Sequence, residues 1–477
     1  MTTPLDIGSR LELLVDDCLV ERMSDTVNLR LHHPDRREVV ITFDRPWEGN
    51  TCGYGTVIRD ADLYHLYYRG ASMHIGGGNL TYTHPETTCY AQSRDGVSWE
   101  KPNLGLVEFD GSRENNIILA NEGIGEGAGK GISHNFSPVL DTNPDCSPDA
   151  RFKALGGCGG GLYALKSADG IRWTLLNDAP VVTEGAFDSQ NLAFWDAERG
   201  CYVEYHRGMR DGRDVAMSTS DDFIHWSQPQ WLEYEPERLT QLYTNQIEPY
   251  YRAPHLYVGF PARYVADRGW YSPINEEISE SSGSRRCGTD YTDTGFITSR
   301  DGDLFNVWPE AFLRPGPTPE LWMYGVGYTA WGLVETAPSV PGGPPEISFY
   351  VSDAGGWKGP ANSLCRHTLR LDGFVSATAP LAGGELVTRP IIFDGSALWL
   401  NFETSVAGSI QVELQHADGS PIPGFALSDC PPMFGNSVHR KVEWTGEARL
   451  SSLAGKPARM RILIADADLF AFRFGEE

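Results

Sequence analysis

The chain has 477 residues, of which 39 are lysine or arginine and 64 are aspartate or glutamate, so its formal net charge is -25. This excess of negative charge repels phosphate backbones and anionic lipid headgroups, and we expect neither nucleic acid nor a membrane surface as a partner. The length exceeds that of one ordinary domain and predicts two domains.

The N-terminal segment 1–17 has no basic stretch followed by an apolar one, and no run of eighteen apolar residues occurs in the sequence. This predicts a cytoplasmic protein, or an exported one whose signal peptide is absent from this sequence. The nine cysteines form no C-x-x-C pair, and apart from His32 and His33 no histidine stands at ligand spacing. We therefore expect reduced thiols, no metal and no cofactor, and the composition is compatible with a homo-oligomer.

A short phrase recurs along the chain: SRDGVSWEKP at 93–102, SADGIRWTLL at 167–176, STSDDFIHWSQP at 218–229 and SRDGDLFNVW at 299–308. Each copy follows a run of β-branched and aromatic residues, which predicts a strand, a tight turn at Asp-Gly and a second strand. Repeated hairpins of this kind are typical of a β-propeller, whose loops gather at one end of a central channel. The repeat itself indicates architecture, because a hairpin corner needs no chemistry.

From about 50 to 375, short apolar strands alternate with Gly, Pro, Asn and Asp turns, and no helical period lasts three turns. Strands are expected at 63–69, 192–195, 201–206, 256–260, 332–335, 347–351 and 366–371. Grouped around the repeats, they predict an all-β fold with a five-bladed β-propeller over 1–375. Insertions at 72–86, 121–137 and 264–290 are rich in glycine and serine, and we expect surface loops there, some of them able to close over a ligand.

After residue 375 the sequence changes to regular alternation of apolar and polar residues, as in SALWLNFETS and ARMRILIADADLFAFRF. This pattern predicts a β-sandwich over 376–477. It carries no cluster of titratable residues, so we expect a structural appendage that covers an edge of the propeller. A sugar-binding accessory module is the alternative.

Three carboxylates stand close to the starts of predicted strands, in polar or aromatic surroundings: Glu48 in RPWEGN, Asp188 in FDSQN and Glu248 in NQIEP. Glycoside cleavage needs two carboxyl groups, one protonated to release the leaving group and one ionised to attack or to activate water. The 13 Trp, 20 Tyr and 20 Phe also offer flat faces for sugar rings. We therefore predict that the three carboxylates face one cavity at the funnel end of the propeller.

Candidates for substrate binding are polar and aromatic side chains near these carboxylates or at other predicted strand entrances: Trp47, Asn50, His134, Gln190, Asn245, Arg252, His255 and Asp293. Simpler interpretations stand beside these roles. Asp188 can cap a turn, and Pro249 beside Glu248 can mark an ordinary strand edge. If Glu248 is not the acid, Asp290 or Asp293 takes that role.

In the order of its predicted domains, a propeller followed by a β-sandwich, the chain resembles the five-bladed propeller glycoside hydrolases of families 32 and 43. Family 32 carries an Asp nucleophile in Asn-Asp-Pro-Asn-Gly, a stabilising Asp in Arg-Asp-Pro and a Glu acid/base in Glu-Cys. Here WEGN, FDSQ and QIEP stand at about these positions, and none of the three family motifs is literally present. The phrases PWEGN, FDSQNLAFWD and GFPARY are similar to a bacterial group described as family-32-like, and this resemblance implies glycoside hydrolysis.

We therefore predict a glycoside hydrolase that acts on a terminal or small glycoside, with furanosides and fructosides among the options, and a carbohydrate as its partner. In a retaining version Glu48 attacks the anomeric carbon, Glu248 protonates the leaving oxygen and Asp188 stabilises the developing charge. In an inverting version Glu48 or Asp188 is the base for water. Two alternatives are a glycoside phosphorylase, with Arg252, Arg263 and His255 around phosphate, and a carbohydrate-binding propeller without catalysis.

Overall fold

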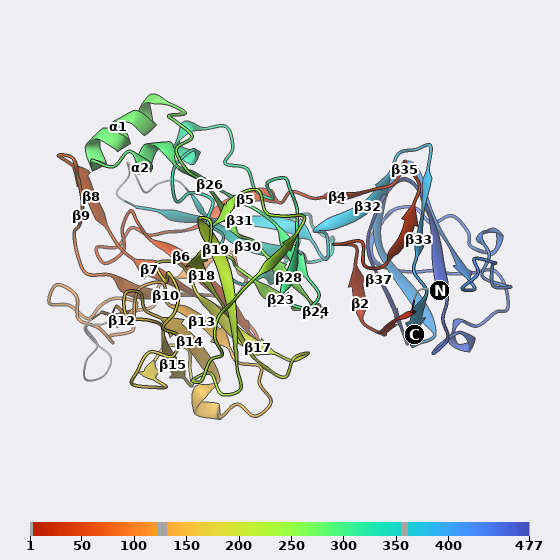
Figure 1. Ribbon diagram of the computed structural model, residues 1–477, viewed down its shortest axis with the longest axis horizontal. Helices are drawn as coiled ribbons and strands as arrows, with labels where there is room; N and C mark the ends of the chain where they lie inside the picture. The colour runs from red at the N-terminus through yellow and green to blue at the C-terminus, as the bar shows by residue number, and fades with distance from the viewer. Residues whose placement is uncertain (1–2, 122–130, 354–360, 477) are drawn as a thin grey trace.

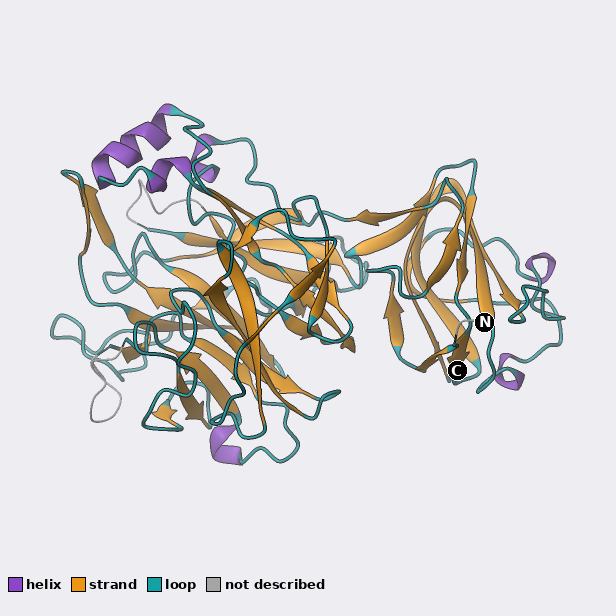
Figure 2. Ribbon diagram, viewed as in Figure 1, coloured by secondary structure: helices purple, strands orange, loops and turns teal. Residues whose placement is uncertain are grey.

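The computed structural model describes residues 3–121, 131–353 and 361–476. Over these ranges the protein is nearly all β, as the sequence predicts (Figure 2). The helical elements are α1 (Pro273–Ser282), α2 (Arg286–Thr289) and 3-10 turns at Pro148–Ala150, Pro319–Leu321, Leu427–Asp429 and Leu450–Ser452. In the described ranges, no helix is both long enough and apolar enough to cross a membrane. Figure 1 shows a larger and a smaller lobe, with both chain ends in the smaller one.

Five sheets of four or five strands make up most of the larger lobe. The first holds β6 (Gly53–Asp60), β7 (Leu63–Gly70), β10 (Thr87–Ser93), β11 (Trp99–Glu100) and β12 (Ile117–Ala120). The second holds β13 (Ser137–Leu140), β14 (Phe152–Gly156), β15 (Tyr163–Ser167) and β16 (Thr174–Leu175). The third holds β17 (Leu192–Asp196), β18 (Cys201–Met209), β19 (Arg213–Ser220) and β20 (Gln230–Trp231).

The fourth sheet holds β21 (Glu233–Glu235), β23 (Glu248–Tyr250), β24 (Ala253–Gly259), β27 (Ile297–Ser299) and β28 (Leu304–Val307). The fifth holds β29 (Val334–Thr336), β30 (Glu346–Asp353), β31 (Ser363–Arg370) and β5 (Asp35–Thr42). Two smaller sheets join β22 (Gln241–Leu242), β25 (Ala262–Val265) and β26 (Tyr291–Thr294), and β8 (Met73–Gly76) with β9 (Asn79–Tyr82). The strands expected from the sequence all fall within or overlap these elements.

The first strands of successive sheets lie close to one another. The Val57 amide donates to the Trp331 carbonyl at 2.7 Å, which links β6 to the segment before β29. Gln190, just before β17, donates to Thr56 Oγ1 at 2.9 Å and accepts from Gln246, just before β23, at 2.6 Å. Because these polar groups are buried and bonded to one another, they tie the first, third and fourth sheets together at the centre of the lobe.

The repeated Asp-Gly corner has a structural role that links neighbouring sheets. Gly96, Gly170 and Gly302 have φ values of +72°, +72° and +74°, a conformation that favours glycine. Each lies against the hydroxyl of a tyrosine from another sheet: Tyr350 donates to the Gly96 carbonyl at 2.6 Å and Tyr205 to that of Gly302 at 2.8 Å. The repeat is therefore a corner onto which another sheet packs.

Substituting Gly170 by Ala is expected to lower the free energy of unfolding by about 1–3 kcal/mol, because a Cβ there meets the Tyr67 hydroxyl at 2.5 Å and the φ is positive. Urea denaturation measures the loss. The matched control is Gly105→Ala, which has a φ of +67° but no atom within 4 Å of its Cβ. A loss no larger than that of the control contradicts the packing role.

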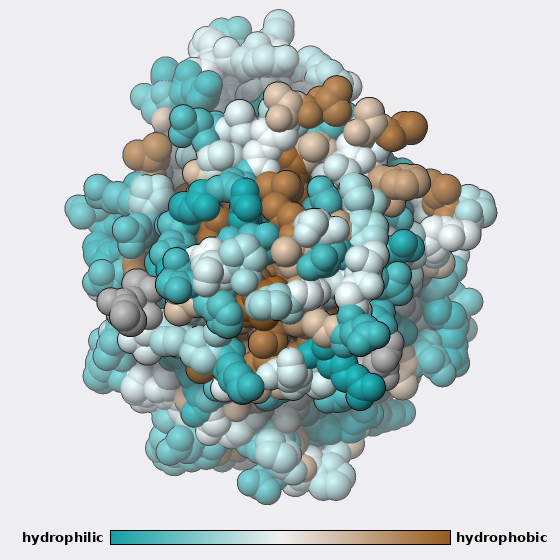
Figure 3. Space-filling view, turned by 90° about the vertical axis from the view of Figure 1, so that its right-hand side faces the viewer, coloured by the Kyte–Doolittle hydropathy of each residue, from teal (hydrophilic) through white to brown (hydrophobic). Residues whose placement is uncertain are grey.

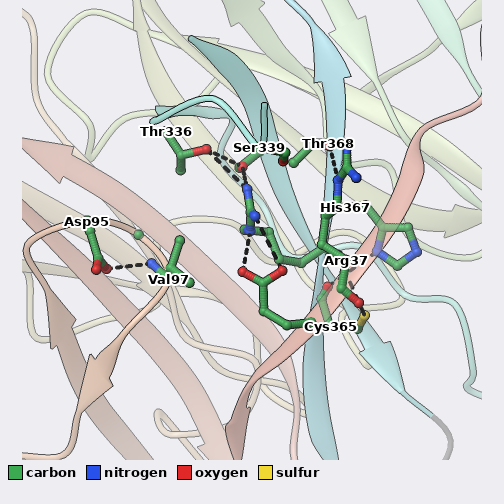
Figure 4. A network of polar contacts seen from close by, with 12 residues as sticks. Arg37, Asp95, Val97, Thr336, Ser339, Cys365, His367 and Thr368 are labelled. Carbon is green, nitrogen blue, oxygen red and sulfur yellow. Dashed lines mark hydrogen bonds and ion pairs between the residues drawn. The ribbon is translucent and has the colours of Figure 1, made fainter. Parts of the chain in front are cut away.

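The fifth sheet is completed by the N-terminal strand β5, which pairs with β31. Arg37 of β5 donates to Thr368 Oγ1 of β31 at 2.8 Å, and Arg366 of β31 donates to Glu38 of β5 at 3.0 Å. Figure 4 shows Arg37 beside Thr368, with Cys365 and His367 on the same strand. Residues far apart in the sequence thus close the larger lobe.

The smaller lobe contains N-terminal strands, and the expected division of the chain at 375/376 is wrong in this respect. β1 (Leu5–Gly8) pairs with β34 (Ile391–Phe393), while β2 (Leu11–Leu13), β3 (Val20–Met23) and β4 (Asn28–Leu31) join the sheet of β32 (Val375–Ala379), β33 (Gly384–Thr388), β35 (Ala397–Gln415), β36 (Asn436–Lys441) and β37 (Arg459–Gly475). Ile7 of β1, and Leu19 and Val27, which directly precede β3 and β4, belong to the same apolar core as Ile410 and Phe472. Burial of those side chains explains why residues 5–31 pack here.

The surface of the smaller lobe, which faces the viewer in Figure 3, is mixed in polarity. Hydrophilic residues surround several hydrophobic ones, some of them in a hollow near the centre of this view. The most exposed large hydrophobic residues of the lobe are Leu381, Val406 and Phe434. They are separate in the sequence, and single exposed apolar residues are normal on a protein surface.

Candidate active site

A cavity of about 250 Å³ in the larger lobe is lined by residues that precede its central strands. Its lining is polar and aromatic: Asn50, Thr51, Cys52, Gly53, Tyr54, Arg69, Met73, Tyr82, His134, Asp188, Tyr243, Tyr324, Gly325, Val326, Tyr328, Ser352, Asp353 and Asn362. Segments of different sheets meet here because the first strand of each sheet starts at the same end of the lobe. We call this space the Asp188 cavity.

Asp188 is the exposed carboxylate on the wall of this cavity, and its side chain is 62% accessible. Its Oδ1 accepts a hydrogen bond from His134 Nε2 at 3.1 Å. This bond and the charges of His134, Arg207 and Arg69 lower the pKa of Asp188 to about 2, against the opposing effect of partial burial. The carboxylate is thus ionised at any pH above that value and faces solvent in the cavity.

A chain of alternating charges holds Asp188 in place. His134 Nδ1 contacts Glu86 Oε2 at 2.8 Å, and Glu86 lies 3.5 Å from Arg69. Burial lowers the pKa of His134, but its hydrogen bonds to Asp188, Cys158 and Glu86 outweigh burial and raise it to about 11. His134 is therefore a cation at neutral pH, and its two N–H groups are directed at two carboxylates.

Substituting His134 by Gln is expected to raise the pKa of Asp188 toward its ordinary value, because the hydrogen bond and the charge that stabilise the carboxylate are lost. Activity that needs ionised Asp188 then falls at a higher pH than in the wild type, and we expect its acidic limb to move up by about one to two pH units. The pH profile of kcat/KM measures this shift. An unchanged acidic limb contradicts the coupling.

Five tyrosines also line the cavity: Tyr54, Tyr82, Tyr243, Tyr324 and Tyr328. Tyr54, Tyr243, Tyr264 and Tyr328 pack in one buried cluster with Tyr324 against it. The rings of Tyr243 and Tyr328 are stacked with centroids 5.6 Å apart. Flat aromatic faces and phenol hydroxyls are the groups that sugar rings and their hydroxyls bind.

Two insertions lie beside the cavity entrance. The hairpin β8–β9 carries Met73 and Tyr82 into the cavity wall, and the amide of Gly78 at its tip donates to the Ser281 carbonyl of α1 at 3.1 Å. The expected loop at 264–290 is partly helical. Ser272 and Asn275 form a capping box at the start of α1, and Gly283 with φ +63° ends this helix. Of the expected loop at 121–137, residues 122–130 lie outside the described residues.

Glu48 does not line the Asp188 cavity. Its carboxylate is fully buried, lies 2.7 Å from Lys101 Nζ, accepts the amide of Arg45 at 2.9 Å and accepts the hydroxyl of Tyr68. With its oxygens taken up by these donors, Glu48 stabilises the turn before β6. The expectation that Glu48, Asp188 and Glu248 face one cavity is therefore wrong.

Glu248 begins β23 and is also absent from the cavity lining. Burial raises its pKa to about 8, against hydrogen bonds from the backbone of Leu333 and Gly332. It is consequently protonated at neutral pH, as an acid should be. It stands two residues after Gln246, which donates to Gln190.

Asn50 and His134 are the two predicted substrate-binding residues that line the cavity. The others have structural partners. Trp47 donates to Asn116 at 2.7 Å, Gln190 donates to Thr56, and Asn245 donates to the Tyr205 carbonyl at 3.3 Å. Arg252 donates to Asp372 at 2.8 Å, His255 contacts Glu12 at 3.5 Å, and Asp293 accepts hydrogen bonds from Nε and Nη2 of Arg263, both at 2.7 Å. Asp290 accepts the Tyr264 hydroxyl. None of these residues belongs to the lining of the Asp188 cavity, so the expected phosphate site of Arg252, Arg263 and His255 is not assembled there.

Glu86, Arg69 and Tyr243 are the main residues of the site that the sequence did not single out. Glu86 stands in the insertion THPETT and Arg69 ends a strand, and neither carries a motif. Tyr243 precedes the strand that begins at Glu248 and lies in the same polar segment, QLYTNQIEP. Its place in this segment was the one sequence feature that could have indicated it. Among the described residues, no group of three or more His, Cys, Asp or Glu side chains is placed to hold a metal ion.

No family model matches the chain. Two uncharacterized proteins from strains of Mycobacterium tuberculosis are 27% identical to it over 162 residues, which is 34% of this chain and 44% of theirs. The chain thus spans less than half the length of these curated relatives.

Several solved structures are similar to the chain at low identity. A fructofuranosidase from Schwanniomyces occidentalis complexed with fructose is 11% identical, with a TM-score of 0.39, over 92% of this chain and 97% of that one. A thermostable family-43 glycoside hydrolase is 11% identical, with a TM-score of 0.41, over 71% and 96%. An N-acetylgalactosamine deacetylase from F. plautii is 12% identical, with a TM-score of 0.39, over 77% and 95%. Glycoside hydrolases, the class that the sequence resembles, are thus among the similar structures.

Proposed function

We propose that the protein is a glycoside hydrolase that binds a terminal or small sugar in the Asp188 cavity. The observation that carries this proposal is an exposed, ionised carboxylate on the wall of a cavity lined by tyrosines. A volume of about 250 Å³ lies at the lower end of ligand pockets and suits one sugar ring better than a long oligosaccharide. Other donors at this wall, such as His134 and Arg69, are held by carboxylates and keep their geometry.

The architecture that goes with this function is a five-bladed β-propeller followed by a β-sandwich. The five sheets of the larger lobe are the blades, and the corners at Gly96, Gly170 and Gly302 pack three of the four repeats against another blade. β5 closes the ring as the fourth strand of the last blade. In such a fold the loops at one end of the channel form the site, which is where Asp188 lies.

The role of Asp188 follows from its ionisation. A carboxyl with a pKa of about 2 holds no proton at neutral pH, so it cannot protonate a leaving group. It is also a weak base for water, because an efficient base has a pKa nearer to the working pH. Asp188 therefore acts on the anomeric carbon as a nucleophile, or as a fixed negative charge opposite the oxocarbenium-like transition state.

Glycoside phosphorolysis remains the second candidate because Arg69 lies on the cavity wall and its buried Nε has no hydrogen-bond partner among the described residues. A guanidinium suits a phosphate oxygen as well as a sugar hydroxyl. The same Arg69 also contacts Glu86 and the Asn135 carboxamide, however, so much of its charge is already balanced. Hydrolysis is accordingly the leading proposal.

The test is a panel of aryl-furanosides, aryl-pyranosides and fructo-oligosaccharides incubated with the wild type, with and without inorganic phosphate. We expect release of a monosaccharide from one sugar class, independent of phosphate. Turnover that requires phosphate and yields a sugar phosphate favours the phosphorylase. Binding of a sugar by calorimetry without any cleavage favours a carbohydrate-binding propeller.

A further inference from the structure

A hydrolase in which Asp188 is ionised needs a separate proton donor, and no carboxyl group among the described lining residues of the cavity supplies one. Besides Asp188, the carboxylate among the described lining residues is Asp353, which forms an ion pair with Arg36. Glu248 is protonated but does not line the cavity. The protons of His134 are directed at Glu86 and Asp188.

The tyrosines of the cavity are the remaining acids, and one of them differs in its surroundings. The hydroxyl of Tyr243 lies 3.5 Å from the backbone oxygen of Asp188, which places it beside that residue. Tyr324 donates a hydrogen bond to the Tyr243 oxygen at 3.1 Å, and Arg286 donates to the Tyr324 oxygen at 2.5 Å. This chain of donors is directed at the Tyr243 oxygen and stabilises it when it loses its proton.

Two further guanidinium groups lie against the Tyr243 ring. Arg207 stands over it at 4.8 Å from the ring centroid and Arg213 at 5.3 Å. Positive charge at this distance favours the phenolate over the phenol. No other tyrosine of the cavity wall combines two cations over its ring with a phenol that donates to its oxygen, within the part of the chain that the structure describes.

The electrostatics follow this geometry. Burial and the charge of Asp188 raise the pKa of Tyr243, but the hydrogen bond from Tyr324, the charge of Arg207 and contact with Tyr54 outweigh them and lower it below its ordinary range. The other four tyrosines of the wall, Tyr54, Tyr82, Tyr324 and Tyr328, have raised pKa values because burial dominates. Tyr243 is thus the phenol best suited to give up and regain a proton.

We propose that Tyr243 is the proton donor of the Asp188 cavity, an inference that rests on the proposed glycoside hydrolysis. As the bond between the anomeric carbon and the leaving oxygen breaks, its electron pair stays on that oxygen, which takes the proton of Tyr243. The phenolate left behind is held by Tyr324 and faces the charge of Arg207. Water then supplies a hydroxyl to the anomeric carbon and returns a proton to Tyr243, so that one water is consumed per glycosidic bond.

Leaving groups of different basicity test this role. For the sugar that the panel identifies, Tyr243→Phe is expected to lower kcat/KM about 100- to 10,000-fold with a methyl glycoside, whose leaving oxygen must be protonated. With a 2,4-dinitrophenyl glycoside, which leaves without a proton, we expect a loss of less than about tenfold. The matched control is Tyr264→Phe, which removes a phenol of the same cluster outside the cavity, and any loss should be equal for the two substrates.

A second variant separates acid catalysis from simple packing. Tyr324→Phe removes the hydrogen bond that stabilises the Tyr243 phenolate, so the pKa of Tyr243 rises and the basic limb of the kcat/KM profile moves to higher pH. A Tyr243→Phe variant that is impaired equally on both leaving groups, or on neither, overturns the proposal and leaves the glycosidase intact. If the wild type cleaves neither substrate for any sugar, the proposed function fails and this inference falls with it.

Discussion

Asp188→Asn is expected to lower kcat/KM on the glycoside that the wild type cleaves by at least about 1,000-fold, because the amide keeps the shape of the side chain but carries no negative charge at the anomeric centre. The side chain is 62% exposed, so the fold should tolerate the change. Initial rates at fixed pH, with the melting temperature measured in parallel, give the result. The loss belongs to the chemical step if KM changes little while kcat falls.

Asp178→Asn is the matched control for this variant. Asp178 is an exposed aspartate on the segment that leads to Asp188, and it is not part of the cavity. Its substitution removes the same charge from an exposed position ten residues earlier in the chain, and we expect activity within about twofold of the wild type. Equal losses in the two variants, or less than tenfold loss in Asp188→Asn, contradict the role of Asp188.

The second large effect concerns stability. Lys101→Met is expected to lower the free energy of unfolding by about 3–5 kcal/mol, because it leaves the fully buried carboxylate of Glu48 without its cation. Lys101 Nζ also donates to the Thr42 carbonyl at 2.6 Å, so β5 loses a contact at its end. Chemical denaturation followed by tryptophan fluorescence measures the change.

The double variant Glu48→Gln with Lys101→Met tests the reason for that loss. Removing both charges leaves no unpaired ion in the core, so we expect the double variant to be more stable than Lys101→Met alone. Glu48→Gln should also retain most of the activity, since its carboxylate faces Tyr68 and Lys101 and not the cavity. Complete loss of activity in a folded Glu48→Gln protein would restore Glu48 as a candidate nucleophile.

The sequence predicts the larger lobe well because its signals are local. Asp-Gly corners with flanking β-branched runs indicate hairpins at 93–102, 167–176 and 299–308, and the structure places a turn between two strands in each. The remaining copy, at 218–229, departs from the pattern because Phe223, with a φ of +69°, stands in place of the glycine. The tyrosine contacts of the corners could not be predicted, since they join residues far apart in the chain.

The strands of the smaller lobe could not all be predicted from local sequence patterns. Residues 5–31 have the same strand pattern as the segments that follow. Their pairing with C-terminal strands, of β1 with β34, β2 with β37, β3 with β33 and β4 with β32, assigns them to this lobe. Such pairings depend on tertiary packing, which propensity and periodicity do not contain. A domain boundary placed at 375, where the pattern of apolar and polar residues changes, therefore failed to include the N-terminal strands in the smaller lobe.

The residues that line the Asp188 cavity were predicted in part. Asp188 and His134 lie in the cavity because polar residues before central strands collect at one end of the lobe. The same reasoning selected Glu48 and Glu248, but a strand entrance does not decide whether a carboxylate faces solvent or a buried lysine. Glu86 and Tyr243 were missed because their roles arise from ion pairs and arginine contacts between distant segments.

A crystal structure of Asp188→Asn with the glycoside that the panel identifies tests whether a glycoside is processed at Asp188. We expect the sugar in the Asp188 cavity, its anomeric carbon about 3–3.5 Å from the oxygen of Asn at position 188 and its leaving oxygen toward Tyr243. A sugar bound elsewhere, or with its anomeric carbon turned away from this position, would contradict it.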